Sequence, residues 1–241
     1  MRPDDFFVKP KPGKPQNIIL FAGHDLPAGR QGFTHFNDEC FILCDGVQSL
    51  PHARVAEELT AETAHWAYKA IRQSPFYGKE RLPFLKRIFR STNLRLWQKR
   101  RDPGFDLGLA SALMVLITID DYFWVGSAGN CNSFLFREGL IDILTKRDVD
   151  DEFNITKAVG FARTQLVPNM HSERLLENDI ILLATDSIAN FVSEDQMRVV
   201  FEKVGTTTES LQEAIKKLMD IATSTGSRDT MSAVLVKRII V

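Results

Sequence analysis

Aspartates stand at the ends of three strongly apolar segments of this 241-residue chain. Asp45 directly follows Phe-Ile-Leu-Cys, Asp186 directly follows Ile-Ile-Leu-Leu-Ala-Thr, and Asp229 comes just before Thr-Met-Ser-Ala-Val-Leu-Val. If these segments are strands that share one edge of a packed sheet, three carboxylates converge, and their mutual repulsion calls for a cation. Oxygen ligands suit Mg²⁺ or Mn²⁺ better than zinc, and none of the 5 histidines forms a metal-ligand spacing with another histidine or a cysteine.

Each aspartate also has a simpler interpretation, because Asp after a strand is a common turn former and helix N-cap. Asp45 is the more informative residue, since Gly46 follows it. A glycine there lets the backbone approach a ligand closely and offers its carbonyl oxygen as a further ligand. From the residues alone, metal ligation and turn formation remain alternatives.

The elements that would position these residues are mainly strands. Short runs rich in Ile, Val, Leu and Phe, bounded by Gly, Asp and Asn, predict strands near 16–23, 39–46, 112–119, 122–129, 132–139, 179–186 and 231–241. Two-residue turns such as Asp120-Asp121 and Glu138-Gly139 indicate antiparallel hairpins.

Three segments have helical periodicity instead: His52–Arg72, Lys79–Arg101 and Glu209–Thr223. In the first, a stripe recurs at spacings of three and four and predicts the buried face: Val55, Ala56, Leu59, Thr63, Ala67, Ala70 and Ile71. Antiparallel strands with helices in consecutive pairs indicate an α+β fold in which helices cover sheet faces. Proline-rich residues 1–16 predict an extended segment, and residues 17–241 a single domain.

Net charge, cysteine number and the lengths of the apolar segments indicate which partners and which compartment to expect. With 30 Lys+Arg against 31 Asp+Glu the net charge is −1, which argues against overall attraction to nucleic acid or to a membrane surface. Cys40, Cys44 and Cys131 are odd in number, and two lie in one apolar run, which predicts reduced buried thiols. No segment has the length of an apolar membrane span or the core of a signal peptide, so we expect a cytoplasmic protein.

The order of the segments resembles one family. FILCDGVQSLPHARVAEELTAETA, with its strand, Asp-Gly turn and helix, resembles the first signature of the metal-dependent type 2C serine/threonine protein phosphatases. SALMVLITIDDYFWVGSAGNCNSFLFREGLIDILTKRD resembles that family's central hairpins, and ITKAVG resembles its Ile-Thr-Arg-Ala-Leu-Gly segment. ENDIILLATDSIANFVSEDQM resembles the strand ending in Ser-Asp-Gly, and SRDTMSAVLV the terminal Asp-Asn and strand. The resemblance covers roughly residues 17 to 241.

The resemblance implies a fold, a reaction and a ligand set. The fold is a four-layer α-β-β-α sandwich, two central antiparallel sheets flanked by helix pairs. Two ions, Mn²⁺ or Mg²⁺, would be held by Asp45, the carbonyl of Gly46, Asp186 and Asp229. A water activated by these ions attacks the phosphorus of phosphoserine or phosphothreonine, so no covalent protein nucleophile is needed. We expect a monomer with a phosphoprotein substrate, and a cognate serine/threonine kinase is a candidate partner in signalling.

Several positions depart from the family pattern. Asp-Gly-x-Gly-Gly becomes Asp45-Gly46-Val47-Gln48-Ser49, and Asn190 stands where the family has a second aspartate after the strand. Neutral Asn130 replaces a carboxylate that the family associates with a third, weaker ion, so that ion is doubtful here. These departures motivate an alternative function, an inactive or weak pseudophosphatase that binds phosphoproteins or regulates.

Two further features leave alternatives open. Arg30 is either the ligand for the substrate phosphate or a solvated loop arginine. Asp25 is an outer carboxylate in one alignment of this segment with the family pattern. Asn37-Asp38 predicts a hairpin turn. The helix at 79–101 carries enough positive charge to suggest an acidic partner or simply a solvated face.

Overall fold

Ten strands form two antiparallel sheets in the computed structural model, which describes residues 17–27, 32–75, 81–164 and 166–240. In sheet A, neighbouring strands follow the order β1 (Asn17–Leu26), β10 (Met231–Ile240), β9 (Ile180–Ala184), β6 (Asn132–Arg137) and β7 (Leu140–Ile143). In sheet B the order is β2 (Phe33–Phe36), β3 (Cys40–Gly46), β4 (Ser111–Ile119), β5 (Tyr122–Ala128) and β8 (Asn169–Arg174). The predicted turns join β4 to β5 and β6 to β7 as antiparallel hairpins.

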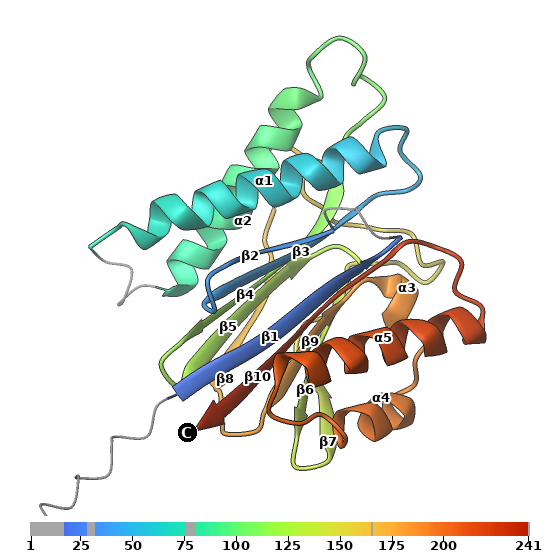
Figure 1. Ribbon diagram of the computed structural model, residues 1–241. Helices are drawn as coiled ribbons and strands as arrows, with labels where there is room; N and C mark the ends of the chain where they lie inside the picture. The colour runs from blue at the N-terminus through green and yellow to red at the C-terminus, as the bar shows by residue number, and fades with distance from the viewer. Residues whose placement is uncertain (1–16, 28–31, 76–80, 165, 241) are drawn as a thin grey trace, which may run out of the picture.

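Helices cover the outer faces of both sheets. Figure 1 shows α1 (Ala53–Arg72) and α2 (Arg81–Lys99) over sheet B, and α3 (Asp186–Ala189), α4 (Glu194–Phe201) and α5 (Thr208–Thr225) over sheet A. The expected α+β class and four-layer sandwich are confirmed. The three predicted helices correspond to α1, α2 and α5, and α3 and α4 are additional. No helix of the described chain has both the length and the apolar character needed to cross a membrane.

The central strands bury both of their faces. Phe41 and Leu43 of β3 pack against sheet A, whereas Ile42 and Cys44 pack beneath α1 and α2. Because side chains alternate along a strand, burial on both sides explains why this segment is a continuous apolar run. Asp45 follows on the same side as Leu43, where the core ends.

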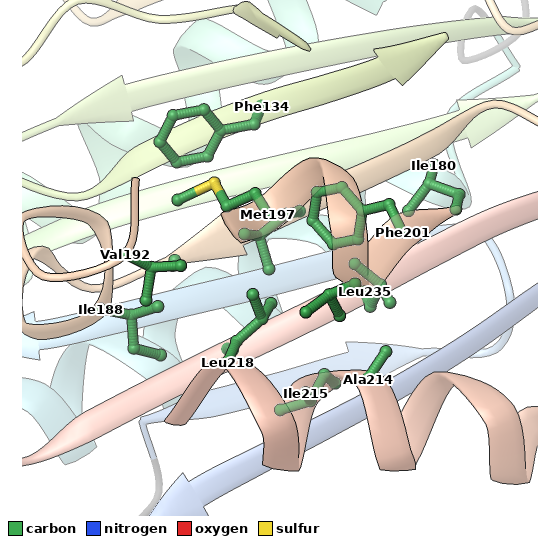
Figure 2. Close-up of a cluster of buried hydrophobic side chains, with 14 of the residues drawn as sticks. Phe134, Ile180, Ile188, Val192, Met197, Phe201, Ala214, Ile215, Leu218 and Leu235 are labelled. Atoms are coloured by element: carbon green, nitrogen blue, oxygen red, sulfur yellow. The ribbon is translucent and has the colours of Figure 1, made fainter. Parts of the chain in front are cut away.

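The core beneath α3, α4 and α5 is apolar (Figure 2). Met197 and Phe201 of α4 meet Phe134 of β6 and Leu218 of α5 in this cluster. The Phe201 ring is 2% exposed, and its centroid lies 5.6 Å from that of Phe136. This dense packing anchors α4 and α5 to sheet A.

The buried face of α1 differs from the predicted stripe. Ala56 and Ile71 are buried as predicted, but Val55 and Ala70 are exposed. The buried face also includes Glu57, Ala64 and Tyr68. The predicted stripe was wrong at Val55 and Ala70 because it was drawn without charged residues. A stripe chosen in this way leaves out a buried glutamate such as Glu57.

Candidate metal centre

The three predicted aspartates line one pocket of about 350 Å³. Asp45 comes from the end of β3 in sheet B, whereas Asp186 follows β9 and Asp229 precedes β10 in sheet A. Because β9 and β10 are antiparallel, the residues after β9 and before β10 meet at the same edge of the sheet. Gly46 lines the same pocket, so all four predicted metal-ligand residues lie together.

The Asp45-Gly46 pair is held by β4 and α1. Ser111 of β4 pairs with Gly46 in the strand register, and its hydroxyl donates to the Asp45 carbonyl oxygen at 3.0 Å. The Gly46 N–H donates to Glu57 Oε2 at 3.4 Å. A Cβ on Gly46 would lie 2.0 Å from the Ala53 carbonyl oxygen, so only glycine allows α1 to begin this close to β3.

Hydrogen bonds on both sides of Asp186 tie it to the segment that leads into β10. The Thr185 N–H donates to the Ser232 carbonyl oxygen at 3.1 Å, and the Ser232 N–H donates to Thr185 Oγ1 at 3.1 Å. On the other side, Ser187 Oγ donates to the Thr230 carbonyl oxygen at 2.7 Å. The position of Asp186 therefore depends on contacts across the sheet.

The end of α5 places Asp229. Gly226 adopts a left-handed conformation with φ of 113°, the usual way for glycine to end a helix. The Ser227 N–H then donates to the Ala222 carbonyl oxygen at 2.9 Å, and the chain turns toward β10. Asp229 follows within this turn, exposed at the pocket.

Charges in the pocket act on one another. Burial raises the pKa of the Asp186 carboxyl above its ordinary value; hydrogen bonds from Asn130 and the Ser187 N–H oppose the rise, and the charge of Asp229 adds to it. Burial also raises the pKa of the Cys131 thiol, with the charges of Asp45 and Asp186 adding to the effect. The carboxylates of Asp45 and Asp186, which come from different sheets, thus both act on the Cys131 thiol, and this thiol stays protonated.

Asn130 shows that the pocket contains oxygen atoms suited to a cation. Its Nδ2 donates to Asp186 Oδ2 at 2.6 Å, while its Oδ1 is buried and has no hydrogen-bond partner among the described residues. Carboxylates, a backbone carbonyl and this amide oxygen are the donors that hard divalent ions prefer. Within the described ranges, however, no three His, Cys, Asp or Glu side chains form a ready-made metal site. The candidate oxygen donors therefore line one pocket, but the described side chains are not already arranged as a metal site.

The segment between β7 and β8 forms one wall of the pocket. The Val159 N–H and carbonyl exchange hydrogen bonds with Ser111 at 3.0 and 3.1 Å, which fixes this segment to β4. The Asp150 carboxylate accepts from the Asn154 N–H at 2.9 Å and closes a tight turn. Within this turn Phe153 has φ of 65° and exposes 70% of its surface at the pocket rim.

Two further carboxylates lie near the pocket. Glu57 of α1 is 2% exposed, and its charge, with those of Asp45 and Asp25, adds to the burial that raises the pKa of Cys44. Asp25 lies in β1 opposite Ser232 of β10, and its role as an outer carboxylate stays a prediction. Glu57 escaped the sequence analysis, although a glutamate on the buried face of a helix is itself a signal.

The other predicted residues have different outcomes. Arg30, the candidate phosphate ligand, lies outside the described residues. Gln48 and Ser49 line the pocket, whereas Asn190 accepts a hydrogen bond from Arg147. Asn37, with φ of 50°, lies in the predicted turn, here between β2 and β3.

No family model matches the sequence, and no curated protein matches it. Solved structures do match. PppA, "a key regulatory component of T6SS in Pseudomonas aeruginosa", superposes with a TM-score of 0.76 at 16% identity, covering 93% of this chain and 100% of PppA. The catalytic domain of the serine/threonine protein phosphatase PstP, in complex with 2 manganese ions, gives 0.72 at 17% identity, covering 93% of this chain and 100% of that domain.

A third structure is the serine/threonine phosphatase Stp1 from Staphylococcus aureus, with a TM-score of 0.75 at 14% identity. It covers 93% of this chain and 95% of its own. At these identities the likeness concerns the fold. The two-sheet sandwich of the chain is that of bacterial serine/threonine phosphatases of the type 2C fold, over nearly its whole length.

Proposed function

We propose that this chain, which has the fold of bacterial serine/threonine phosphatases, hydrolyses phosphoserine and phosphothreonine in proteins with Mn²⁺ or Mg²⁺. The observation that carries the proposal is the convergence of Asp45, Asp186 and Asp229, from both sheets, on one pocket. The manganese complex of PstP, a protein of the same fold, supports the choice of metal. Because each sheet supplies ligands, residues 17–241 act as one domain in this proposal.

In the proposed site the four ligand residues, Asp45, Asp186, Asp229 and Gly46 through its carbonyl oxygen, hold two ions. When bound, such ions supply charge that stabilises the phosphoryl transition state and lower the pKa of water. The chain contributes by keeping the donors in one volume, with Ser111 fixing Asp45 and the Thr185 contacts fixing Asp186. Neutral Asn130 offers no charge to a third ion, so the proposal has none.

The side chains around the proposed site favour attack by water. Cys44 and Cys131 are buried, and burial raises the pKa of both thiols, so neither serves as a nucleophile. Besides the aspartates, the pocket is lined by neutral side chains that include Gln48 and Phe153. These side chains shape the approach of a phosphorylated residue without adding charge.

Hydrolysis of p-nitrophenyl phosphate and of a phosphothreonine peptide tests the proposal. Both are measured with Mn²⁺, with Mg²⁺ and with EDTA, beside the Asp45→Asn protein. We expect metal-dependent turnover that the substitution removes while circular dichroism stays unchanged. A folded wild-type protein without turnover in any metal would contradict the phosphatase.

A second candidate function is a phosphoprotein-binding pseudophosphatase. The observation that favours it is the 2.6 Å hydrogen bond from Asn130 to Asp186 Oδ2, which occupies one oxygen of a proposed ligand. PppA, named as a regulatory component, has this fold, which supports this second candidate. Titration calorimetry with Mn²⁺ separates the two: the phosphatase binds two ions, and a binding module at most one weak ion.

The proposed phosphatase works in a reducing compartment. Three buried, unpaired cysteines, Cys40, Cys44 and Cys131, support a reducing compartment such as the cytoplasm. There the chain acts as a monomer on signalling phosphoproteins and opposes a serine/threonine kinase. Size-exclusion chromatography with light scattering tests the monomer.

A further inference from the structure

A second pocket, also of about 350 Å³, lies between α2 and the segment that leads into β8. We call it the α2 groove. The residues that line it include Lys86, Arg90, Asn93, Arg163, Leu166 and Pro168. None of its described lining residues is acidic, so the groove is a cationic depression with an apolar side.

Positive charge is concentrated on α2. The helix Arg81–Lys99 contains six Lys or Arg residues and no Asp or Glu, although the net charge of the chain is −1. Lys86 and Arg90 lie one turn apart, and neither they nor Arg163 form an ion pair with a described residue. Like charges one turn apart destabilise a helix, so an anion from outside the chain relieves their repulsion.

The groove is held together by fixed contacts. Asn93, 3% exposed, donates to the carbonyl oxygens of Ala162 at 2.8 Å and Arg163 at 3.3 Å, and accepts from the Gly160 N–H at 2.9 Å. The Arg163 guanidinium lies 5.3 Å from the centre of the Trp97 ring. Arg163 is therefore oriented by Trp97 of α2, and it lines the groove together with Lys86 and Arg90.

The groove adjoins the candidate metal pocket along the chain. Phe161 lines that pocket and Arg163 lines the groove, and two residues span at most about 7 Å. Exposed acidic residues at 150–152 precede Phe153 on another part of the pocket rim. A bound peptide therefore meets positive charge beyond Phe161 and negative charge beside Phe153.

We propose that the α2 groove binds acidic side chains that flank the phosphorylated residue of the protein substrate on one side. The inference rests on the proposed phosphatase function and names its substrate class. A nucleic acid, charged along its whole length, would also meet the acidic rim and the pocket aspartates, so the charge pattern favours a peptide. Lys86, Arg87, Arg90 and Arg95 of α2 are all exposed, but only Lys86 and Arg90 line the groove.

Binding of fluorescein-labelled phosphothreonine peptides, followed by anisotropy, tests the groove directly. The peptides carry an Asp/Glu cluster before the phosphothreonine, the same cluster after it, or the matching Asn/Gln residues. We expect one acidic peptide to bind about tenfold more tightly than its neutral form. The preference should fall with added salt.

The double variant Lys86→Ala/Arg90→Ala should lose this preference. The control Arg87→Ala/Arg95→Ala removes two charges from the same helix outside the groove and should keep it. Arg163→Ala tests the opposite wall if the double variant misfolds by circular dichroism. Equal loss in the control, no preference in the wild type, or tighter binding of a single-stranded oligonucleotide would overturn the proposal.

Turnover of p-nitrophenyl phosphate separates this proposal from the function on which it rests. The substrate is too small to reach the groove, so its hydrolysis should be equal in the wild type and in all groove variants. Hydrolysis without any peptide preference refutes the groove alone. A peptide preference lost in the double variant, in a protein without hydrolysis, supports the groove and refutes the phosphatase.

Discussion

The two helix layers cover equivalent faces of the two sheets, but they differ in what they bury. Every buried residue of α4 and α5 is apolar, as Figure 2 illustrates, whereas α1 buries Glu57 against Gly46. The adjoining α2 carries six cationic side chains and no acidic one. One layer thus supplies mainly packing energy, and the other places charge around the candidate site. Only at α3, which begins with Asp186, does the packing layer reach the pocket.

The largest effect should come from that single point of contact. Asp186→Asn should lower Mn²⁺-dependent hydrolysis of p-nitrophenyl phosphate about a thousandfold, since it removes a charged ligand. The melting temperature in EDTA should not fall, because the amide removes a charge that burial and the neighbouring Asp229 disfavour. Retained hydrolysis would mean that Asp186 holds no ion.

Phe201→Ala tests the packing layer. Removal of this buried ring should reduce the free energy of unfolding by about 3–5 kcal/mol, measured in urea. Turnover per folded molecule should be preserved below the melting temperature. The matched control is Val199→Ala on the same helix, where Val199 is exposed and the change should stay within about 0.5 kcal/mol. Lost turnover in folded Phe201→Ala would show that the two layers are not separable.

Glu57→Gln should affect metal binding rather than stability, the reverse of Phe201→Ala. The amide keeps the shape of the side chain but removes a buried negative charge beside Gly46, so Mn²⁺ affinity by calorimetry should fall about tenfold. Glu58→Gln is the control, because Glu58 pairs with Arg54 at the surface. Similar affinities in the two variants would place Glu57 among structural residues only.

Asn130→Asp tests how an added charge in the pocket changes metal binding and stability. The change removes the hydrogen bond to Asp186 and adds a carboxylate, so Mn²⁺ affinity and activity should rise several-fold. In EDTA the melting temperature should fall because like charges repel, and Mn²⁺ should restore it. An affinity equal to that of the wild type would count against a metal site at Asn130.

The smallest effect concerns pH and α1. Burial lowers the pKa of His65, and the charges of Lys69 and His35 add to the shift. The unfolded chain therefore takes up a proton first as the pH falls, so stability declines below about pH 6.5 until the folded imidazole is protonated as well. His65→Gln should flatten that part of the curve of melting temperature against pH. An unchanged slope would assign the decline to other groups.

The strands were predictable in proportion to their burial. β3, β4, β9 and β10 are buried on both faces and appear in the sequence as continuous apolar runs. β2, β7 and β8 were not predicted as strands, since all three are edge strands with half-exposed or exposed, partly polar residues. α4 had an unused signal, the capping box between Ser193 and Gln196.

The candidate site was predictable where its residues follow strands. Asp45, Gly46, Asp186 and Asp229 lie at one pocket, as the strand ends indicate, and their role as ligands stays a prediction. Glu57 was missed because charged residues were not used to find the buried face of α1. The contact of Asn130 with Asp186 depends on residues far apart in the chain, and spacing carries no information about it.

The pairing of β1 with β10 places a late step in the folding of the described chain. β1 has β10 as its only neighbour in sheet A, and Asn17 pairs with Ile240. During synthesis β2 to β5 can meet early, whereas β1 waits for the last described strand to leave the ribosome. Assembly is therefore dominated by contacts between distant residues, which makes folding slow. Since Asp229 lies just before β10, the same late event brings the third aspartate to the pocket.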